Sequence, residues 1–318
     1  MGTATNPILT NLQPVGQHKR RRINNKALWG YIFVTPVILY LLVFSLGPIL
    51  FSFWVSLHNW NMITPIKEMK SVGLGNFRYI LGDDGVFRKA LVNTFRFTIL
   101  GVSTNTILGL AGALLLNSNI RFRTFWRTIF FLPIVTAPLA LGMMWGTLLS
   151  KNFGLVNRIL GAFGLPAQPF FSSPDQALYC IILIAVYQYV GYYIIVMTAG
   201  LQGIPEEYYD AAAVDGASWL QAFRHITLPL LRPVVLFLVV TNTIGALQVF
   251  DIVFATTTGG AETSGGGPAG ATMVLVLHMY NNAFKFFKMG RASAMAMILF
   301  AIIFVTTFIQ LRLSKDQE

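Results

Sequence analysis

Residues 206–229 read EEYYDAAAVDGASWLQAFRHITLP, a polar stretch that lies between two long apolar segments of the chain. The chain is otherwise strongly apolar, so an ordered polar segment of this length needs an explanation. Two were weighed: a docking element for a soluble partner, and an ordinary amphipathic connector at the membrane interface. Spacing alone favours neither of them. In the docking interpretation, Tyr208, Tyr209 and Trp219 are candidate anchors for the partner.

The local chemistry of this stretch predicts two short helices joined by a glycine turn. Pro205 suits the first turn of a helix, where its missing N–H costs little. The dipeptide Asp215-Gly216 is typical of a turn. Ser218 and Gln221 have the spacing of a capping box, which predicts that a second helix begins there.

The rest of the sequence predicts an all-α, polytopic membrane protein. Mean hydropathy is +0.62, and only 11% of the residues are charged. Continuous apolar runs of about 20 residues match the thickness of a hydrocarbon core, and lipid requires such spans to be helical. Six runs qualify: 29–53, 91–115, 125–149, 177–201, 233–255 and 292–313. The only cysteine, Cys180, falls inside the fourth run, so we expect it to contribute to packing.

Charge placement predicts the topology. Basic residues His18-Lys19-Arg20-Arg21-Arg22 precede the first span, and short basic flanks remain in the cytoplasm. An even number of spans returns the C-terminus to the same side. The expected organisation has five segments: a basic cytoplasmic tail (1–27), the first transmembrane helix (28–56), an external segment (57–89), a five-helix core (90–313) that contains a cytoplasmic loop (204–230), and a cytoplasmic tail (314–318).

Residues inside the spans suggest where helices pack and where a solute passes. Gly101, Asn105, Gly109 and Ala113 recur every four residues, which predicts a face that allows close helix approach. Polar residues inside spans face a cavity or another helix. The candidates for a solute pathway are Tyr187, Gln188, Tyr192, Asn242, Gln248 and Asp251. The last three are expected to fall on roughly one side of the fifth span. Interfacial tyrosines and hydrogen bonds between helices remain an alternative explanation for these residues.

Several motifs together resemble the permease subunits of bacterial binding-protein-dependent ABC importers. Asp210-Ala211-Ala212, then Gly216, then Ile226-Thr227-Leu228-Pro229 resembles their signature loop, and Ile204-Pro205-Glu206-Glu207 resembles the carbohydrate-uptake branch. Further matches are Gly73-Leu74-Gly75-Asn76-Phe77, Asn93-Thr94-Phe95, Phe130-Phe131-Leu132-Pro133 and Phe250-Asp251. Asp210 stands where the family usually has Glu, and the loop 259–267 is longer than usual.

The resemblance implies a type I ABC importer permease fold in the bacterial inner membrane, embedded in lipid, with both termini cytoplasmic. It implies partners: a cytoplasmic ABC ATPase dimer, a second permease subunit in a heterodimer, and an extracytoplasmic solute-binding protein. It also implies that ATP and magnesium bind the ATPase, and that this chain binds no cofactor and is not an enzyme. By carry-over, the ATPase-coupling residues are Glu207, Asp210, Ala211, Ala212, Asp215 and Gly216. The implied cargo is a sugar, oligosaccharide or related polyol.

Two other classes of function were weighed. A self-contained secondary carrier or channel usually needs buried charge networks, whereas the charges found within the predicted spans, away from their cytoplasmic ends, are Arg96 and Asp251. A membrane-embedded enzyme would need a His/Asp/Glu constellation in the spans, and none is visible in the sequence. The sequence has no GxxxxGK[ST] phosphate loop, so we expect no ATP hydrolysis by this chain. We also expect no nucleic-acid partner, despite a formal net charge of +11.

Overall fold

The computed structural model describes residues 25–118, 121–257 and 265–315. It divides into two units, Met1–Phe51 and Ser52–Glu318. The first unit contains α1 (Asn25–Leu41), a π-helical turn (Leu42–Leu46) and the start of α2 (Gly47–Ser56). Together they form a continuous apolar helix, Trp29–Ser56, that is long enough to cross a membrane. This helix covers the predicted first span, 29–53.

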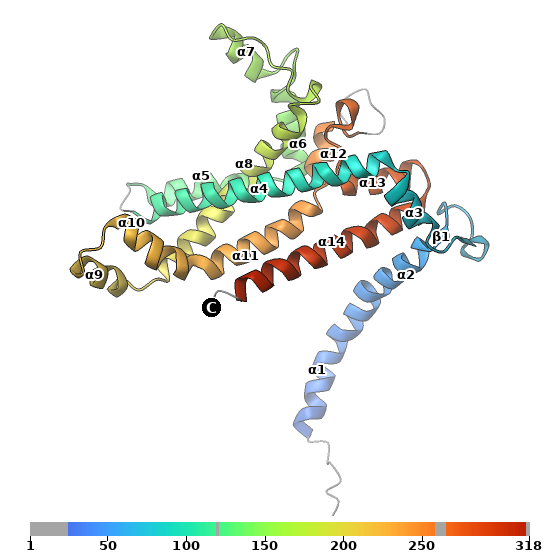
Figure 1. The fold of residues 1–318 in the computed structure, drawn as a ribbon, viewed down its shortest axis with the longest axis horizontal. Coiled ribbons are helices and arrows are strands. Elements are labelled where there is room, and N and C mark those ends of the chain that lie inside the picture. The colour runs from blue at the N-terminus through green and yellow to red at the C-terminus, as the bar shows by residue number, and fades with distance from the viewer. Residues whose placement is uncertain (1–24, 119–120, 258–264, 316–318) are drawn as a thin grey trace, which may run out of the picture. The chain divides into compact units, whose positions relative to one another are not determined.

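The second unit is helical apart from a small antiparallel sheet in which His58 pairs with Ser71 (Figure 1). Its strands are β1 (His58–Asn59) and β2 (Lys70–Ser71). Its helices are α3 (Gly75–Gly82), α4 (Gly85–Asn117), α5 (Arg123–Val135), α6 (Pro138–Leu148), α7 (Leu155–Ala162), α8 (Ala177–Gln202), α9 (Glu207–Val214), α10 (Trp219–Ala222), α11 (Leu228–Leu247), α12 (Asp251–Thr257), α13 (Leu275–Tyr280) and α14 (Met289–Lys315). Short 3₁₀ turns cover Ile66–Glu68, Phe170–Ser172 and Pro268–Gly270, and π-helical turns cover Phe223–Thr227 and Asn281–Lys285.

Within the described residues, five helical stretches are long and apolar enough to cross a membrane, and a bent pair, α5 and α6, supplies a sixth span if counted as one. In the second unit α4 packs against α8 and α11, and α11 packs against α14 (Figure 1). The prediction of a helical polytopic membrane protein is therefore confirmed.

The predicted fifth span, 233–255, needs a correction. The helix begins earlier, at Trp219, and ends at Leu247. Pro229 lacks the N–H that an α-helix needs at that position, and the π-helical turn Phe223–Thr227 directly before α11 changes the hydrogen-bond ladder there. The sequence had suggested that Asp251 and Asn242 lie on one helix. The structure instead places Asp251 at the start of a separate helix, α12.

The third span is interrupted, as its two prolines predict, but at only one of them. Helix α5 continues through Pro133, whereas α5 and α6 meet at 97° just before Pro138. Ala137 has extended backbone angles, φ −57° and ψ 130°, because a residue before proline is sterically kept out of the helical region.

Small residues on α4 allow close packing against α8. Gly101, Asn105, Gly109 and Ala113 are all buried. A Cβ added at Gly109 would collide with Tyr193 of α8, and one added at Gly112 would lie 2.7 Å from Ile194. The four-residue spacing thus correctly predicted a helix-packing face.

A buried polar pair ties the start of α4 to α13. Asp84 accepts a hydrogen bond from the Phe87 backbone N–H at 2.9 Å through Oδ1, which caps α4. Through Oδ2 it contacts His278 Nε2, also at 2.9 Å. Both side chains are more than nine-tenths buried. Buried polar groups need such partners, so this pair fixes the two helices together.

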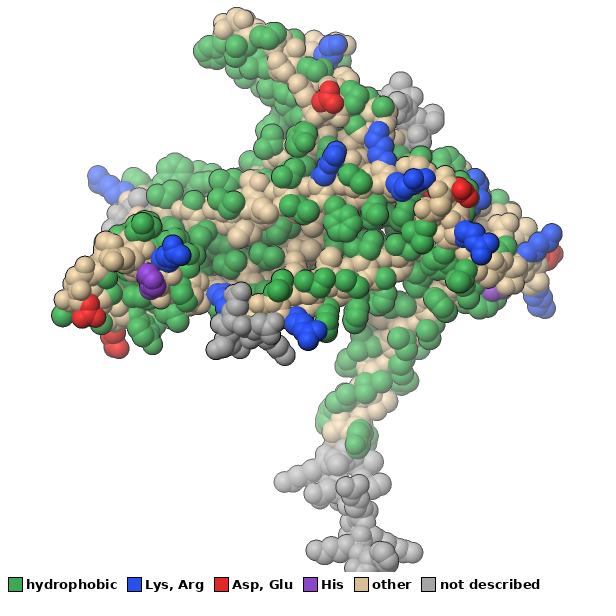
Figure 2. Space-filling view, in the orientation of Figure 1, with side chains coloured by type: hydrophobic (Ala, Val, Ile, Leu, Met, Phe, Trp, Pro, Cys, Tyr) green, Lys and Arg blue, Asp and Glu red, His purple; other side chains and the backbone are tan. Residues whose placement is uncertain are grey.

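The outer sides of the long helices are apolar. Figure 2 shows hydrophobic side chains over most of their visible length, while Lys, Arg, Asp and Glu gather toward the ends. On α14, Phe300, Phe304 and Phe308 are all more than half exposed. Contiguous apolar surface of this extent is typical of a face that contacts lipid.

Candidate functional site

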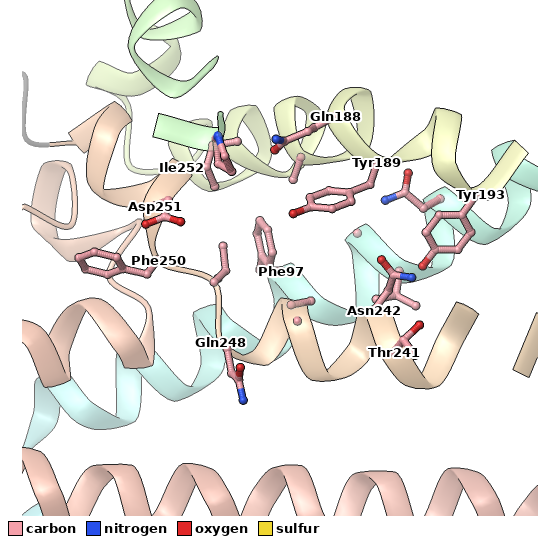
Figure 3. Close-up of a pocket in the computed structure, with 18 residues that line it drawn as sticks. Phe97, Gln188, Tyr189, Tyr193, Thr241, Asn242, Gln248, Phe250, Asp251 and Ile252 are labelled. Carbon is pink, nitrogen blue, oxygen red and sulfur yellow. The ribbon is translucent and has the colours of Figure 1, made fainter. Parts of the chain in front are cut away.

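A cavity of about 340 Å³ lies within the second unit, between α4, α8, α11 and α12 (Figure 3). Pro138, at the start of α6, also reaches it. Its lining mixes aromatic rings, side-chain amides and hydroxyls. The labelled members in Figure 3 are Phe97, Gln188, Tyr189, Tyr193, Thr241, Asn242, Gln248, Phe250, Asp251 and Ile252.

The amide groups in the cavity wall come from three different helices. Asn242 of α11 donates through Nδ2 to the Leu238 carbonyl at 2.8 Å, a bond to its own helix that does not use Oδ1. Asn105 of α4 is only 6% exposed, and no described residue is a hydrogen-bond partner of its Oδ1. Gln188 of α8 is 2% exposed and donates to the Thr136 carbonyl at 3.2 Å. A buried amide oxygen without a partner favours a bound hydroxyl or water.

Aromatic rings line the same cavity. Figure 3 shows Tyr189 and Phe97 projecting into the same space, with Asp251 nearby. Aromatic faces and hydroxyl groups suit a ligand that has both apolar faces and polar edges. Among the described residues no group of three His, Cys, Asp or Glu side chains could hold a metal ion.

The structure places four of the six predicted pathway residues in this wall: Gln188, Asn242, Gln248 and Asp251. Gln248 lines the cavity, but its side chain points away from Tyr189 in Figure 3. Gln248 and Asp251 were expected to share one side of a helix. They reach the same cavity across the break between α11 and α12 instead.

The two predicted tyrosines lie outside the cavity wall. Tyr187 packs edge-on against Trp145 of α6, with ring centroids 5.7 Å apart. Tyr192 packs edge-on against its neighbour Tyr193. The tyrosines that line the cavity are instead Tyr189 and Tyr193, which follow Ala185 at intervals of four residues. That spacing, one face of an α-helix, was the signal that would have selected them.

The polar loop forms the two helices that the sequence predicts. Helix α9 ends at a turn in which Gly216 has φ +75° and the Ala217 N–H bonds the Ala212 carbonyl at 2.9 Å. Helix α10 follows, and the Ser218 backbone N–H donates to Gln221 Oε1 at 2.7 Å, part of the predicted capping box. Positive φ suits glycine, which lacks a Cβ.

The side chains of this loop divide into an exposed set and an anchored one. Four large apolar side chains are exposed: Tyr208 (53%), Val214 (89%), Trp219 (71%) and Leu220 (64%). Tyr209 instead turns inward, where its hydroxyl bonds Thr227 Oγ1 at 3.0 Å. It therefore anchors α9 to the spans, whereas the sequence had suggested a contact with a partner.

The predicted coupling residues all lie on α9 or its following turn. Glu207, Asp210, Ala211, Asp215 and Gly216 are exposed, and Ala212 is partly buried. The extended loop 259–267 falls largely on residues 258–264, outside the described residues, as does the basic tail 1–24.

Membrane-length helices, an internal cavity and an exposed helical loop define a multi-span membrane transport component. The profile of the family described as "Binding-protein-dependent transport system inner membrane component" matches residues 105–317. The chain belongs to this family. It is a multi-pass permease subunit of an ABC transporter in the inner membrane, a transport component that works with a binding protein.

Individual relatives agree with this assignment. The chain is 33% identical over 290 residues to the "Trehalose/maltose transport system permease protein MalF" of Thermococcus litoralis, covering 91% of this chain and 95% of that protein. It is also 33% identical over 293 residues to the "Lactose transport system permease protein LacF" of Rhizobium radiobacter, with 91% and 95% covered.

A solved structure supports the fold. A chain of the bacterial alginate ABC transporter, crystallised in complex with an alginate pentasaccharide-bound periplasmic protein, matches with a TM-score of 0.78. The match covers 92% of this chain and 96% of that one, at 21% sequence identity. At that identity the likeness bears on the fold.

Proposed function

We propose that this chain forms part of the translocation pathway for a sugar, oligosaccharide or related polyol. The observation that carries the proposal is the cavity, whose lining combines the amides of Asn242 and Asn105 with the aromatic rings of Tyr189 and Phe97. Sugars present hydroxyl edges to amides and C–H faces to aromatic rings. The relatives named for trehalose, maltose and lactose support the same class of cargo.

The polar loop 204–230 is proposed to couple this pathway to a cytoplasmic ATPase dimer, which binds ATP and magnesium. Support comes from its exposed apolar side chains beside the acidic Glu207 and Asp210. Tyr209 links the loop to the π-helical turn before α11. A displacement of α9 would therefore reach a helix that lines the cavity.

A contact between two helix ends supports the membrane orientation that the basic residues predict. Arg232, near the start of α11, donates to the Ser314 carbonyl near the end of α14 at 3.4 Å. The polar loop and the C-terminal end of α14 therefore lie at the same end of the helices. We assign that end, and both termini, to the cytoplasm, with a second permease and an extracytoplasmic binding protein completing the importer.

Affinity purification of the full chain from its native membrane in mild detergent tests the assembly. We expect a stoichiometric ATPase and a second permease to be recovered with it. Recovery of the chain alone, still able to drive solute uptake in ATP-free liposomes, would favour the secondary carrier or channel and overturn the coupling proposal.

Substitution of the loop tests the coupling. Asp210→Lys reverses a charge at an exposed position, so we expect normal insertion with lost ATPase binding and lost uptake. The matched control is Asp83→Lys, which reverses the charge of an exposed aspartate just before the start of α4. We expect it to keep both ATPase binding and uptake. The cargo is tested by uptake of a panel of radiolabelled sugars, in which Asn242→Ala weakens transport of the sugar that the wild type accepts. Equal uptake of that sugar by both proteins would remove Asn242 from the pathway.

A further inference from the structure

The bend between α5 and α6 leaves a carbonyl group that the helices cannot satisfy themselves. The Thr136 N–H still bonds the Pro133 carbonyl at 3.2 Å, and the Leu141 N–H bonds Ala137 at 3.0 Å. The Thr136 carbonyl lies between the two helices, at the end of one and before the start of the next. Carbonyls at a helix end need an outside donor when water is absent.

Gln188 supplies that donor from α8. Its Nε2 donates to Thr136 O at 3.2 Å, across 52 residues of the chain. Among the described residues, this is the hydrogen bond that the Gln188 side chain makes. The residue is 2% exposed. The side chain is therefore committed to the bend, although it also lines the cavity.

Two contacts on either side of Gln188 hold the arms of the bend against α8. Three residues further along α8, the backbone of Phe130 in α5 lies against Gly191, in the space a Cβ would need. On the other side, Tyr187 packs edge-on against Trp145 of α6. Gln188 thus lies at the corner between an arm fixed by backbone contact and an arm fixed by aromatic packing.

The second arm also carries a wall of the cavity. Helix α6 packs closely against α12, where a Cβ added at Gly142 would lie 2.7 Å from Ala255 Cβ and 3.2 Å from Ile252 O. Asp251 and Ile252 of α12 line the cavity. A change in the angle of α6 would therefore move the wall that these residues form.

We propose that Gln188 is a positioning residue that sets the angle between α5 and α6 and, through α6, the position of the α12 wall. Its amide connects the solute space to the one bent span among the described helices. Loss of the bond leaves the Thr136 carbonyl without its donor and lets α6 and α12 move as one body. The transport part of this inference rests on the proposed function, whereas the angle itself does not.

The angle is measured with two spin labels on the full chain in its purified complex. Leu132 on α5 (67% exposed) and Met143 on α6 (62%) accept labels at the surface. Cys180→Ser removes the chain's own thiol, the single cysteine of the sequence. Double electron–electron resonance between the labels then reports the distribution of distances across the bend. The Cys180→Ser complex without the two introduced cysteines, treated with the same spin label, corrects for thiols in the partner subunits.

Gln188→Met keeps the side chain's length and removes the donor, so we expect a broader distance distribution than in the parent. Gln188→Glu gives a sharper test within one sample. At acidic pH the protonated carboxyl donates to Thr136 O and keeps the distribution narrow, whereas at alkaline pH the carboxylate repels that carbonyl and broadens it. Gln248→Met is the matched control, because this glutamine also lines the cavity but points away from Tyr189, and its distribution stays narrow.

Distances that stay narrow in Gln188→Glu at both pH values would overturn the proposal, even if Gln188→Met fails to insert. Uptake kinetics supply the second readout. A positioning role predicts that Gln188→Glu loses Vmax several-fold at alkaline pH with little change in KM. A raised KM with unchanged distances would instead make Gln188 a solute contact. Absence of any sugar uptake in the parent would contradict the proposed function and leave the distance measurement valid.

Discussion

The carbonyl group of Phe130 occupies the space that a Cβ atom at Gly191 would need, so α5 and α8 meet there backbone to backbone. No side chain can adjust to relieve a clash at such a contact. Dense packing of this kind transmits any added volume to the helices themselves.

Gly191→Ala is therefore expected to destabilise the protein. Overpacking typically costs about 1–3 kcal/mol, and backbone is the least able to yield. The measurement is thermal unfolding of the detergent-solubilised complex, with the midpoint as readout. Gly146→Ala on α6 is the control, because no atom in the described part of the chain lies within 4 Å of its added Cβ. It should melt at or above the wild-type temperature, since alanine is favoured over glycine in helices by about 1 kcal/mol. Identical midpoints for both variants would contradict the backbone contact.

The effect of a substitution at Gly216 is expected to depend only on how readily the new residue adopts a positive φ. Its φ is +75° and no atom of the described residues lies within 4 Å of an added Cβ, so space is not limiting. Asn enters the left-handed region readily and Val does not. We expect Gly216→Asn to keep most ATPase binding and uptake, and Gly216→Val to lose both while inserting normally. Co-purification of the ATPase measures this, and an equal loss in the two variants would show that something other than φ selects glycine.

The Asp84–His278 pair is expected to contribute to the stability of the α4–α13 contact. Asp84→Ala removes a helix cap and a buried hydrogen bond, a loss of about 2–4 kcal/mol in all. Asp83→Ala removes the neighbouring exposed carboxylate and should change little. Chemical denaturation followed by tryptophan fluorescence compares them. A wild-type transition for Asp84→Ala would mean that the pair adds nothing to folding.

Tyr189 and Tyr187 are expected to differ although they are two residues apart. Tyr189 lines the cavity, so Tyr189→Ala should raise the KM for uptake, by about tenfold if one stacking and hydrogen-bonding contact is lost. Tyr187 packs on Trp145, so Tyr187→Ala should lower thermal stability and leave KM near that of the wild type. Uptake titrations with both variants decide, and the reverse pattern would return the pathway to Tyr187.

Hydropathy was sufficient to predict the helical fold because the membrane requires every span to be helical and of similar length. It could not locate the break after Leu247, since residues 248–255 are as apolar as the helix before them. The π-helical turn before Pro229 was likewise hidden, because it depends on how neighbouring helices accept the freed groups. The glycine turn and capping box at Gly216 and Ser218 were predictable because their determinants lie within a few residues of each other.

The cavity was predictable only in part. Gln188, Asn242, Gln248 and Asp251 were predicted as polar residues within spans, and all four line the cavity. Which tyrosines of α8 line the cavity depends on the rotation of this helix about its axis. Packing against α4 fixes that rotation, and composition does not reveal it. Asn105 was assigned to helix packing, and it is indeed buried on that face while also lining the cavity.

The turn at Gly216 and the Ser218–Gln221 bonds are formed entirely by residues of the loop itself. Helices α9 and α10 are thus preorganised, and Tyr209 holds the first of them in register with the spans. A subunit that docks there has no chain to order on arrival, so the conformational entropy that usually weakens association is already spent in folding. The loop can then move as a rigid body, so that a displacement at its surface reaches the membrane-spanning helices without local rearrangement.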